Sequence, residues 1–369
     1  MNARVTLSDI AKRASVHIST VSLALHDHPS LPPSTRQRIK SLAEEMGYRR
    51  DPELQALMAY RRSMNVRREA PPLAYVTHWH TRWGWKDSPA HEHFHLGSVR
   101  KAGELGYKVE HFWLGEPGMT ARRLSDILYA RGISGLIFAS HVPTKMMPMD
   151  FDWSRFAAVK IDYCPQSLRL HNVTNDQRSM IQLAMRRILQ AGYRRIGMVM
   201  PRWWNEFVGR AWSAGFLAEQ QDLEPEEQIP ILHYGPARMM DAPAAADWSA
   251  PREEFGRWYD AYRPEVVLSY GRFVHEVFAS LGISVPGDLA FADILLHDEP
   301  GRTAGLRHNS DRVGEVAVEM LVGQLHRHSF GLPDIPSCTL VEGDWCDGRT
   351  LPVFGNVLFR QDFCEAKAV

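Results

Sequence analysis

Short apolar runs alternate with helix-like segments across residues 73–350, and this alternation constrains the fold more than any other feature. Runs such as "LAYVT", "ISGLIFA" and "EVVLSY" have the length and composition of buried strands. Segments such as "MIQLAMRRILQAGY" follow them with apolar residues at helical spacing. A strand–helix–strand rhythm predicts parallel sheets with right-handed crossovers. Because the rhythm occurs twice in tandem, we expect two α/β lobes with a cleft between them.

The N-terminal residues follow a different, all-helical pattern. The stretch "LSDIAKRA" places its apolar residues on one helical face, and "ISTVSLAL" supplies a second short face after a break at residues 15–17. A third helix is predicted in "LPPSTRQRIKSLAEEMGY", with Pro33 in its first turn and Gly47 at its end. Three short helices with a tight turn between the first two predict a helix-turn-helix, although a small three-helix bundle of another kind has the same spacing.

Charge is distributed unevenly along the chain. The formal net charge is zero and 44% of the 369 residues are hydrophobic, which argues against a disordered chain and against a basic histone-like protein. Residues 1–62 nevertheless hold ten Lys and Arg against six Asp and Glu. A basic end on a neutral body indicates a head that binds a polyanion.

Other features bear on cofactors, catalysis and location. The four cysteines (Cys164, Cys338, Cys346 and Cys364) have no metal-ligand spacing, and no phosphate-binding loop, G-x-S-x-G or H-E-x-x-H pattern occurs. The cluster "HEHFH" at residues 91–95 could hold a metal if extended, whereas in a helix His91 and His95 would share a face. We therefore expect no cofactor, no metal and no enzymatic activity. No signal peptide or membrane span is evident, which predicts a cytoplasmic protein.

The head closely resembles the lactose repressor (LacI/GalR) family of bacterial transcription regulators. The resemblance is carried by the order "TLxDIAxxAxVxxxTVSxAL…H…TRxRIxxLAEExGY…Lxx", which runs without a gap from Val5 to Leu57. A looser resemblance continues through "ARGISGLIF", "RPEVVLSY" and "LGISVPGDLAFADI". It implies an N-terminal all-α helix-turn-helix head and an α/β two-lobed, periplasmic-binding-protein-like (type I) effector domain. It further implies a homodimer on a near-palindromic operator in double-stranded DNA.

The same resemblance implies a role for individual residues of the head. Family members read base edges at the positions of Ile18, Ser19 and Leu23, and wedge a hinge-helix leucine, here Leu57, into the minor groove. The residues implied to contact DNA or to support the readers are Thr6, Ile18, Ser19, Thr20, Ser22, Leu23, His26, Thr35, Tyr48 and Leu57.

Three departures from the family pattern affect DNA reading. Leu23 stands where members often carry arginine, so we expect contact with a thymine methyl in place of guanine, the alternative being a core leucine. The hinge has Arg50 at a usual proline position, and Pro52 predicts a shifted helix start. Finally, His17 replaces the usual small N-cap residue.

The loops predicted to face the cleft are rich in tryptophan and histidine. Flat aromatic faces with a few polar anchors suit a sugar-like ligand. Arg272 falls where an aspartate usually accepts sugar hydroxyls, which suggests a negatively charged group on the effector. The candidate effector-binding residues are Trp79, His80, Trp83, Trp85, Trp203, Trp204, Asn205, Arg210, Trp212, Arg272 and Asp293. In the alternative interpretation, these tryptophans fill lobe interfaces and Arg272 pairs with a local carboxylate.

These patterns predict a division of the chain into four parts. Residues 1–49 form the helix-turn-helix domain, 50–72 the hinge helix and linker, 73–350 the effector-binding domain, and 351–369 a tail without a leucine heptad. We expect one lobe from 73–168 with 301–334 and the other from 169–300 with 335–350. The predicted function is a transcriptional repressor of carbohydrate-utilisation genes controlled by a sugar or sugar derivative. The alternative is a sugar-binding protein or sugar enzyme with an N-terminal helical appendage.

Overall fold

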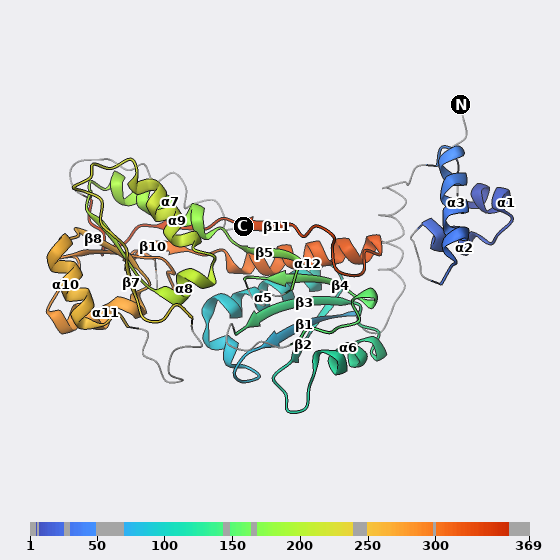
Figure 1. The fold of residues 1–369 in the computed structure, drawn as a ribbon, viewed down its shortest axis with the longest axis horizontal. Helices are drawn as coiled ribbons and strands as arrows, with labels where there is room; N and C mark the ends of the chain where they lie inside the picture. Colours follow the sequence, from blue (N-terminus) through green and yellow to red (C-terminus); the bar gives the residue numbers. More distant parts are fainter. Residues whose placement is uncertain are drawn as a thin grey trace.

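The computed structural model contains a small helical head and a larger body of two α/β lobes (Figure 1). It describes residue 5 and residues 7–25, 30–48, 70–142, 148–163, 168–238, 249–297 and 300–353. None of the helices in these ranges is long and apolar enough to cross a membrane.

Three helices form the head: α1 (Leu7–Ala14), α2 (Ile18–Leu25) and α3 (Pro33–Glu45). Their shared core contains Ile10, Val21 and Ile39, each with 0% of its surface exposed, surrounded by small alanines that let the helices approach closely. The turn between α1 and α2 is tight because Ser15 adopts a positive φ of 52°. The predicted helix-turn-helix is therefore present, with its helices close to the predicted positions.

Two six-stranded sheets form the body. The first has the order β11-β5-β4-β3-β1-β2, and the second has the order β12-β10-β9-β8-β6-β7. All neighbouring strands are parallel except β10 and β12. The first sheet comprises β1 (Pro72–His78), β2 (Lys108–Trp113), β3 (Gly135–His141), β4 (Ala157–Ile161), β5 (His171–Asn175) and β11 (Cys338–Val341). The second comprises β6 (Ile196–Pro201), β7 (Leu232–Tyr234), β8 (Val266–Ser269), β9 (Ala290–Asp293), β10 (Ala304–Arg307) and β12 (Asp344–Cys346).

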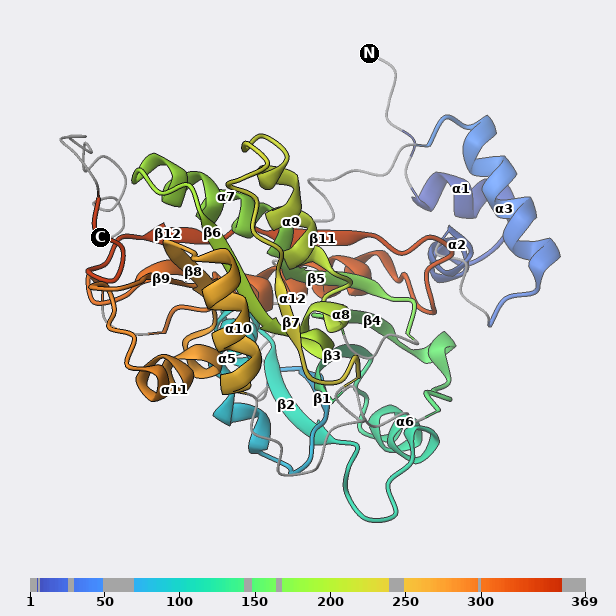
Figure 2. The ribbon, with the colours of Figure 1, turned by 60° about the vertical axis from the view of Figure 1, so that its left-hand side comes forward.

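Helices cover both faces of each sheet, as the strand–helix alternation predicts (Figure 2). In the first lobe, α5 (Pro89–Glu104) and α12 (Ser310–Arg327) enclose one core, and α6 (Ala121–Ala130) helps enclose the other. In the second lobe, α7 (Gln177–Gln190) and α9 (Ala211–Gln220) cover one face, and α10 (Arg252–Tyr262) and α11 (Gly271–Leu281) the other. The remaining helical segments are η1 (Gly84–Asp87), η2 (Trp153–Arg155) and α8 (Arg202–Phe207).

The chain passes between the lobes three times, after β5, β10 and β11. Hydrogen bonds join these crossings: the Asp176 N–H donates to the Val341 carbonyl at 2.8 Å, and the Asn309 amide donates to the Glu342 carbonyl at 2.9 Å. The crossings correct the predicted lobe boundaries. The prediction put β5 and β11 in the second lobe and β10 in the first, whereas sheet pairing places each of them in the other lobe.

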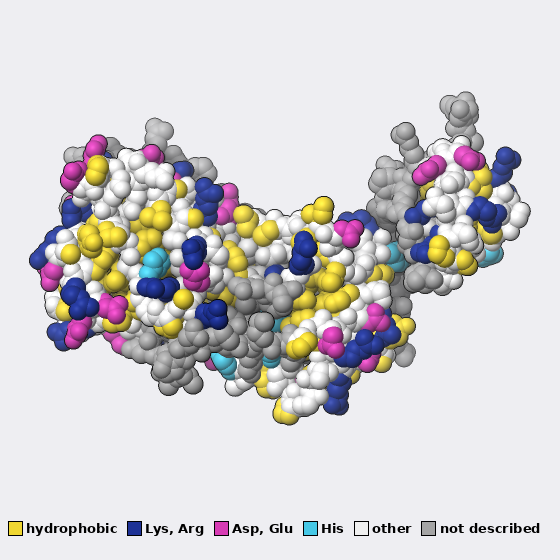
Figure 3. Space-filling view, in the orientation of Figure 1, with side chains coloured by type: hydrophobic (Ala, Val, Ile, Leu, Met, Phe, Trp, Pro, Cys, Tyr) yellow, Lys and Arg dark blue, Asp and Glu magenta, His cyan; other side chains and the backbone are white. Residues whose placement is uncertain are grey.

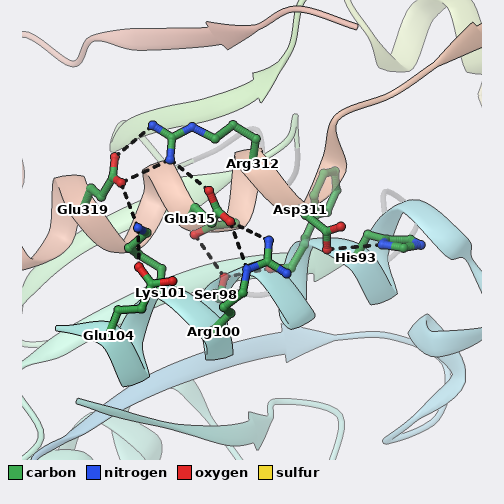
Figure 4. A network of polar contacts seen from close by, with 11 residues as sticks. His93, Ser98, Arg100, Lys101, Glu104, Asp311, Arg312, Glu315 and Glu319 are labelled. Carbon is green, nitrogen blue, oxygen red and sulfur yellow. Dashed lines mark hydrogen bonds and ion pairs between the residues drawn. The ribbon is translucent and has the colours of Figure 1, made fainter. Parts of the chain in front are cut away.

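Helices α5 and α12 cross at very short range (Figure 4). A Cβ added to Gly97 would lie 2.0 Å from the Asp311 carbonyl oxygen, and one added to Gly314 would lie 2.1 Å from the Phe94 carbonyl oxygen. Ion pairs flank the contact, with Arg100 bound to Glu315 at 2.5 Å. Exposed ion pairs of this kind contribute little free energy, so the crossing depends on the two glycines and the apolar core beneath them.

Candidate functional site

The first turn of α2 exposes an uncharged surface. Ile18 is 43% exposed, Ser19 is exposed, and Leu23 is half-buried and lies outside the head's core cluster. Val21 and Leu25 pack in that core instead. This agrees with the prediction that residues other than Leu23 form the buried face of α2, which leaves Leu23 outside the core.

The remaining head residues that were predicted to contact DNA fall into two groups. Thr20, Ser22, Thr35 and Tyr48 are half-buried around the head, where Tyr48 packs against the core. Thr6, His26 and Leu57 lie outside the described residues. Around them, the described part of the head holds five Lys and Arg against three Asp and Glu. Lys and Arg side chains project beside apolar ones on the head surface in Figure 3.

The predicted tryptophans of the first lobe follow strand β1 at the carboxyl edge of the sheet. Trp79 is half-buried, and its ring lies 4.9 Å from that of His91. Trp83 is 49% exposed, with the Lys86 ammonium 4.9 Å from its ring centre. His80 is exposed. Trp79, Trp83 and His80 therefore all offer surface to a ligand.

Trp85 corrects the prediction for this loop. Its side chain is 0% exposed, and its indole N–H donates to the Arg82 carbonyl at 3.1 Å. With its polar atom satisfied and its ring enclosed, Trp85 fills the lobe beneath the loop and offers no surface to an effector.

Two predicted residues of the second lobe are also structural. Trp212 is 2% exposed, belongs to the lobe core and donates to the buried Gln177 side chain at 2.7 Å. Asn205 is 4% exposed, and its amide exchanges two hydrogen bonds with Ser213. Their hydrogen-bonding groups are occupied within the lobe, so both assignments as effector contacts are corrected.

The other predicted residues of this lobe lie nearer its surface. Trp203 and Trp204 are half-buried, and Trp204 packs edge-on against Trp212 with ring centres 4.1 Å apart. Arg210 is exposed and forms an ion pair with Glu206 at 2.9 Å, so its charge is already partnered.

Arg272 and Asp293 line a pocket of about 430 Å³ at the carboxyl ends of β8 and β9. Asp293 accepts hydrogen bonds from the backbone N–H groups of Gly271, at 3.1 Å, and of Leu295, at 2.8 Å, so it fixes the start of α11. The rest of its polar lining comes from Tyr270, His275, His297, Arg302 and Thr303. Neither arginine forms an ion pair with a carboxylate of the described residues. The alternative in which Arg272 pairs with such a carboxylate is therefore not seen.

The sequence interpretation noted His91 and His95 but missed the strand histidines that lie beside them at the edge of the first sheet. His78, His111 and His141 lie at or near the carboxyl ends of β1, β2 and β3, and α5 adds His91 and His95 one turn apart. The signal was present in "VTH" and "ASH", which end β1 and β3, and in "VEH" within β2. The helical alternative for residues 91–95 is confirmed, and the described residues contain no cluster of three or more potential metal ligands.

Burial keeps four of these histidines neutral. It lowers the pKa of His91, His95 and His111 to about 4, and the pKa of His141 to about 3. The Ser140 hydroxyl lies 3.1 Å from His91 Nδ1, and the Asp162 carboxyl lies nearby at the end of β4, where burial raises its pKa to about 6. At neutral pH the edge therefore presents uncharged imidazoles and aromatic faces beside the largely ionised Asp162 carboxyl.

Comparison with known proteins agrees with this architecture. Residues 6–51 match the sequence model of the family described as "Bacterial regulatory proteins, lacI family". The head is therefore similar to the DNA-binding domain of the LacI family. The family model covers the head only, and the chain spans about half or less of the length of the curated relatives it matches.

Individual relatives extend the comparison to the body. The transcriptional regulator GalR of Streptococcus thermophilus is 31% identical over 125 residues, which are 33% of this chain and 35% of that one. The solved structure of the regulator CelR with cellobiose is 16% identical, covers 94% of this chain and all of its own, and has a TM-score of 0.54. The Lac repressor dimer bound to its operator and the anti-inducer ONPF is 14% identical, covers 95% of this chain and all of its own, and has a TM-score of 0.53. These two structures confirm the predicted fold of head and two-lobed body.

Proposed function

We propose that the chain is a sequence-specific DNA-binding transcriptional regulator, a repressor of carbohydrate-utilisation genes. Its DNA affinity is set by a small sugar-like effector held between the two lobes. The observation that carries this proposal is the joining of a helix-turn-helix head, matched by the family model, to a two-lobed α/β body. The proposal includes that the protein binds its effector without catalysing a reaction, and that it acts in the cytoplasm.

The exposed first turn of α2 suits the major groove. In a helix-turn-helix, the N-terminal residues of the second helix contact base edges while other parts of the head contact the phosphates. Ile18 and Ser19 are exposed at that position, and the surplus of basic residues on the head favours a polyanion. A homodimer would place one head on each half of a near-palindromic operator. The hinge residues that would join the heads lie outside the described residues.

An acidic sugar or a sugar phosphate suits the pocket in the second lobe. Arg272 and Arg302 both line the pocket, and neither pairs with a described carboxylate. An arginine fork binds a carboxylate or phosphate through two parallel hydrogen bonds. The aromatic and neutral histidine groups at the edge of the first lobe suit the remainder of a sugar. The regulator CelR, whose structure holds cellobiose, has the same fold.

Selection of duplex DNA from a randomised pool tests the regulator proposal. We expect the purified full chain, at physiological salt, to enrich a near-palindromic site. Enrichment of no sequence, with binding that falls uniformly as salt rises, would favour the alternative of a sugar-binding protein or sugar enzyme with a helical appendage. Repeating the selection with candidate sugars present separates that outcome from a requirement for a corepressor.

The base read by Leu23 gives a specific prediction. Leucine can contact the C5-methyl of thymine but cannot donate to guanine. We expect the Leu23→Arg variant to replace thymine by guanine at one position of each half-site, with a change in preference of roughly fivefold to 150-fold. Competition binding on the two operators measures this change. Ile18→Ala is the control and should leave that position unchanged, whereas an unaltered preference in Leu23→Arg would remove Leu23 from the readers.

The charge of the effector is tested at Arg272. Glucose, glucose 6-phosphate and glucuronate, titrated by thermal shift, compare a neutral sugar with two acidic derivatives. We expect the acidic compounds to bind more tightly, and Arg272→Asp to weaken them by roughly 10- to 150-fold through loss of charged hydrogen bonds. Arg257→Asp on α10 makes the same charge change on an exposed side chain of the same lobe and is the matched control. Equal loss in both variants would contradict a direct contact.

A further inference from the structure

The His17 ring and the Ser19 hydroxyl lie in contact at the start of α2, where the helix is proposed to meet the bases. His17 immediately precedes Ile18, the first residue of α2, and so occupies the N-cap position. Its Nδ1 atom lies 2.8 Å from the Ser19 Oγ atom and 3.4 Å from the Ser19 backbone nitrogen. Ser19 is the second residue of the helix, whose N–H is the usual partner of an N-cap side chain. His17 therefore caps α2 with a ring nitrogen.

The two contacts together determine where the protons lie. A backbone N–H can only donate, so the ring nitrogen toward which it points must be an unprotonated acceptor. The Ser19 hydroxyl, 2.8 Å from that same nitrogen, must then donate its hydrogen to it. A serine hydroxyl has one hydrogen and two lone pairs. Once the hydrogen is committed to His17, Ser19 can only accept a hydrogen bond from any other group.

We propose that His17 makes Ser19 an acceptor-only reader, so that the protein selects adenine or cytosine at the base facing Ser19. This inference rests on the proposed function, in which the first turn of α2 enters the major groove. Adenine and cytosine present an exocyclic amine there, whereas guanine and thymine present a carbonyl oxygen. A carbonyl oxygen would face the serine lone pairs without a hydrogen between them. Accepting guanine or thymine would require the hydroxyl to leave His17.

The Ser19 hydroxyl matters for base recognition because few other side chains of α2 can form hydrogen bonds with bases. The helix "ISTVSLAL" contains no charged side chain. Ile18 and Leu23, the other residues predicted to read bases, are apolar and cannot form hydrogen bonds with base edges. Thr20 and Ser22 are half-buried, whereas Ser19 is exposed. Ser19 is therefore the side chain of this first turn that can distinguish an amine from a carbonyl.

The test uses the full chain and the operator obtained by selection from a randomised pool. Ser19→Ala identifies the position that Ser19 reads, since selectivity is lost there and kept elsewhere. We expect the parent protein to favour adenine or cytosine at this position by about fivefold to tenfold, the value of one hydrogen bond. Replacing that base by its analogue without the amine, purine for adenine or 2-pyrimidinone for cytosine, should weaken the parent by the same factor and leave Ser19→Ala unaffected.

Two substitutions of His17 then distinguish its effect on the Ser19 hydroxyl from its effect on the stability of α2. His17→Phe removes the acceptor and frees the hydroxyl to donate, so the preference at this position should fall to within about twofold while the other positions are kept. His17→Asn retains an acceptor for both the N–H and the hydroxyl and should restore the preference. Thermal unfolding shows whether each variant is folded.

Each other result overturns the inference in a recognisable way. Preference for guanine or thymine at the Ser19 position overturns it even if His17→Phe does not fold. So does an unchanged adenine or cytosine preference in folded His17→Phe, or a Ser19→Ala variant that alters no position. Absence of any selected site in the parent protein overturns the proposed function itself and is thereby distinguished from failure of the His17 assignment.

Discussion

Lowering the pH from 7 to 5 is expected to destabilise the first lobe by a few kcal/mol. His141 is buried and His91 is half-buried at the edge of the first sheet, with pKa values of about 3 and about 4. In the unfolded chain, a histidine pKa is about 6.5. Because the unfolded state binds more protons, stability is fully present above about pH 6.5 and is lost as the pH falls toward the folded pKa values. At pH 5 the loss is about 2 kcal/mol for His141 and somewhat less for His91.

Asp162 acts in the opposite direction. Burial raises its pKa to about 6, so the folded state binds this proton first and gains about 1 kcal/mol at pH 5. The half-buried His95 and His111 have lowered pKa values and add to the loss. The net effect therefore remains destabilising, against a total stability of about 5 to 15 kcal/mol for a typical domain.

Thermal unfolding between pH 7.5 and pH 4.5 measures this dependence, and we expect the Tm to fall by roughly 5 to 10 °C by pH 5. His141→Phe keeps a ring of similar shape and removes one proton site, so its Tm should depend less on pH below 6.5. His80→Asn removes an exposed imidazole and is the matched control. A Tm that is flat between pH 7 and 5 would show that the histidines are not enclosed as described.

Gly314→Ala is expected to destabilise the first lobe by about 3 kcal/mol or more. The added Cβ would lie 2.1 Å from the Phe94 carbonyl oxygen and 2.8 Å from the Ser98 backbone nitrogen. Both atoms belong to the backbone of α5 and cannot turn aside as a flexible side chain would. The helices must therefore separate, which opens the core that α12 covers, including Val313, Ala317 and Val318.

Gly323 provides a matched control on the same helix. A Cβ there would meet only the end of the Arg327 side chain, at 3.3 Å, which can move. Gly323→Ala should be neutral or stabilising by about 0.5 to 1 kcal/mol, because alanine favours a helix interior over glycine. Chemical denaturation of both variants gives the comparison. Similar free energies of unfolding for Gly314→Ala and Gly323→Ala would contradict the close crossing.

The sequence predicts the head and the two sheets because their periodicity is strong, and it fails at the crossings between lobes for identifiable reasons. Strand β5, "HNVTN", is mostly polar although it lies inside the first sheet, so hydrophobicity does not reveal it. The stretch "CTLVEGDWC" contains two strands of different lobes separated by Gly343. That glycine is required because a Cβ there would lie 2.7 Å from the Arg307 carbonyl oxygen, a backbone atom that cannot turn aside. Such a contact across the fold has no local sequence signal.

The residues of the cleft are less predictable than the fold. A tryptophan in a loop has the same sequence signal whether it is enclosed, as Trp85 is, or 49% exposed, as Trp83 is. Asn205 satisfies both sides of its amide on Ser213, a pairing that depends on the turn between α8 and α9. Arg272 lines the pocket, and it was singled out because an arginine stands where the family pattern has an aspartate, a comparison that needs no knowledge of packing. Its contact with an effector stays a prediction.

The three crossings between lobes also order the events of synthesis. The head draws its core from residues 10–43 alone, so it has all its parts soon after it leaves the ribosome. The first lobe lacks α12 and β11 until residue 341 has been made, and the second lacks β12 until residue 346. During most of translation, therefore, a complete helix-turn-helix head is attached to two unfinished lobes with uncovered cores. If the proposed function holds, a nascent or truncated chain would bind DNA without control by an effector.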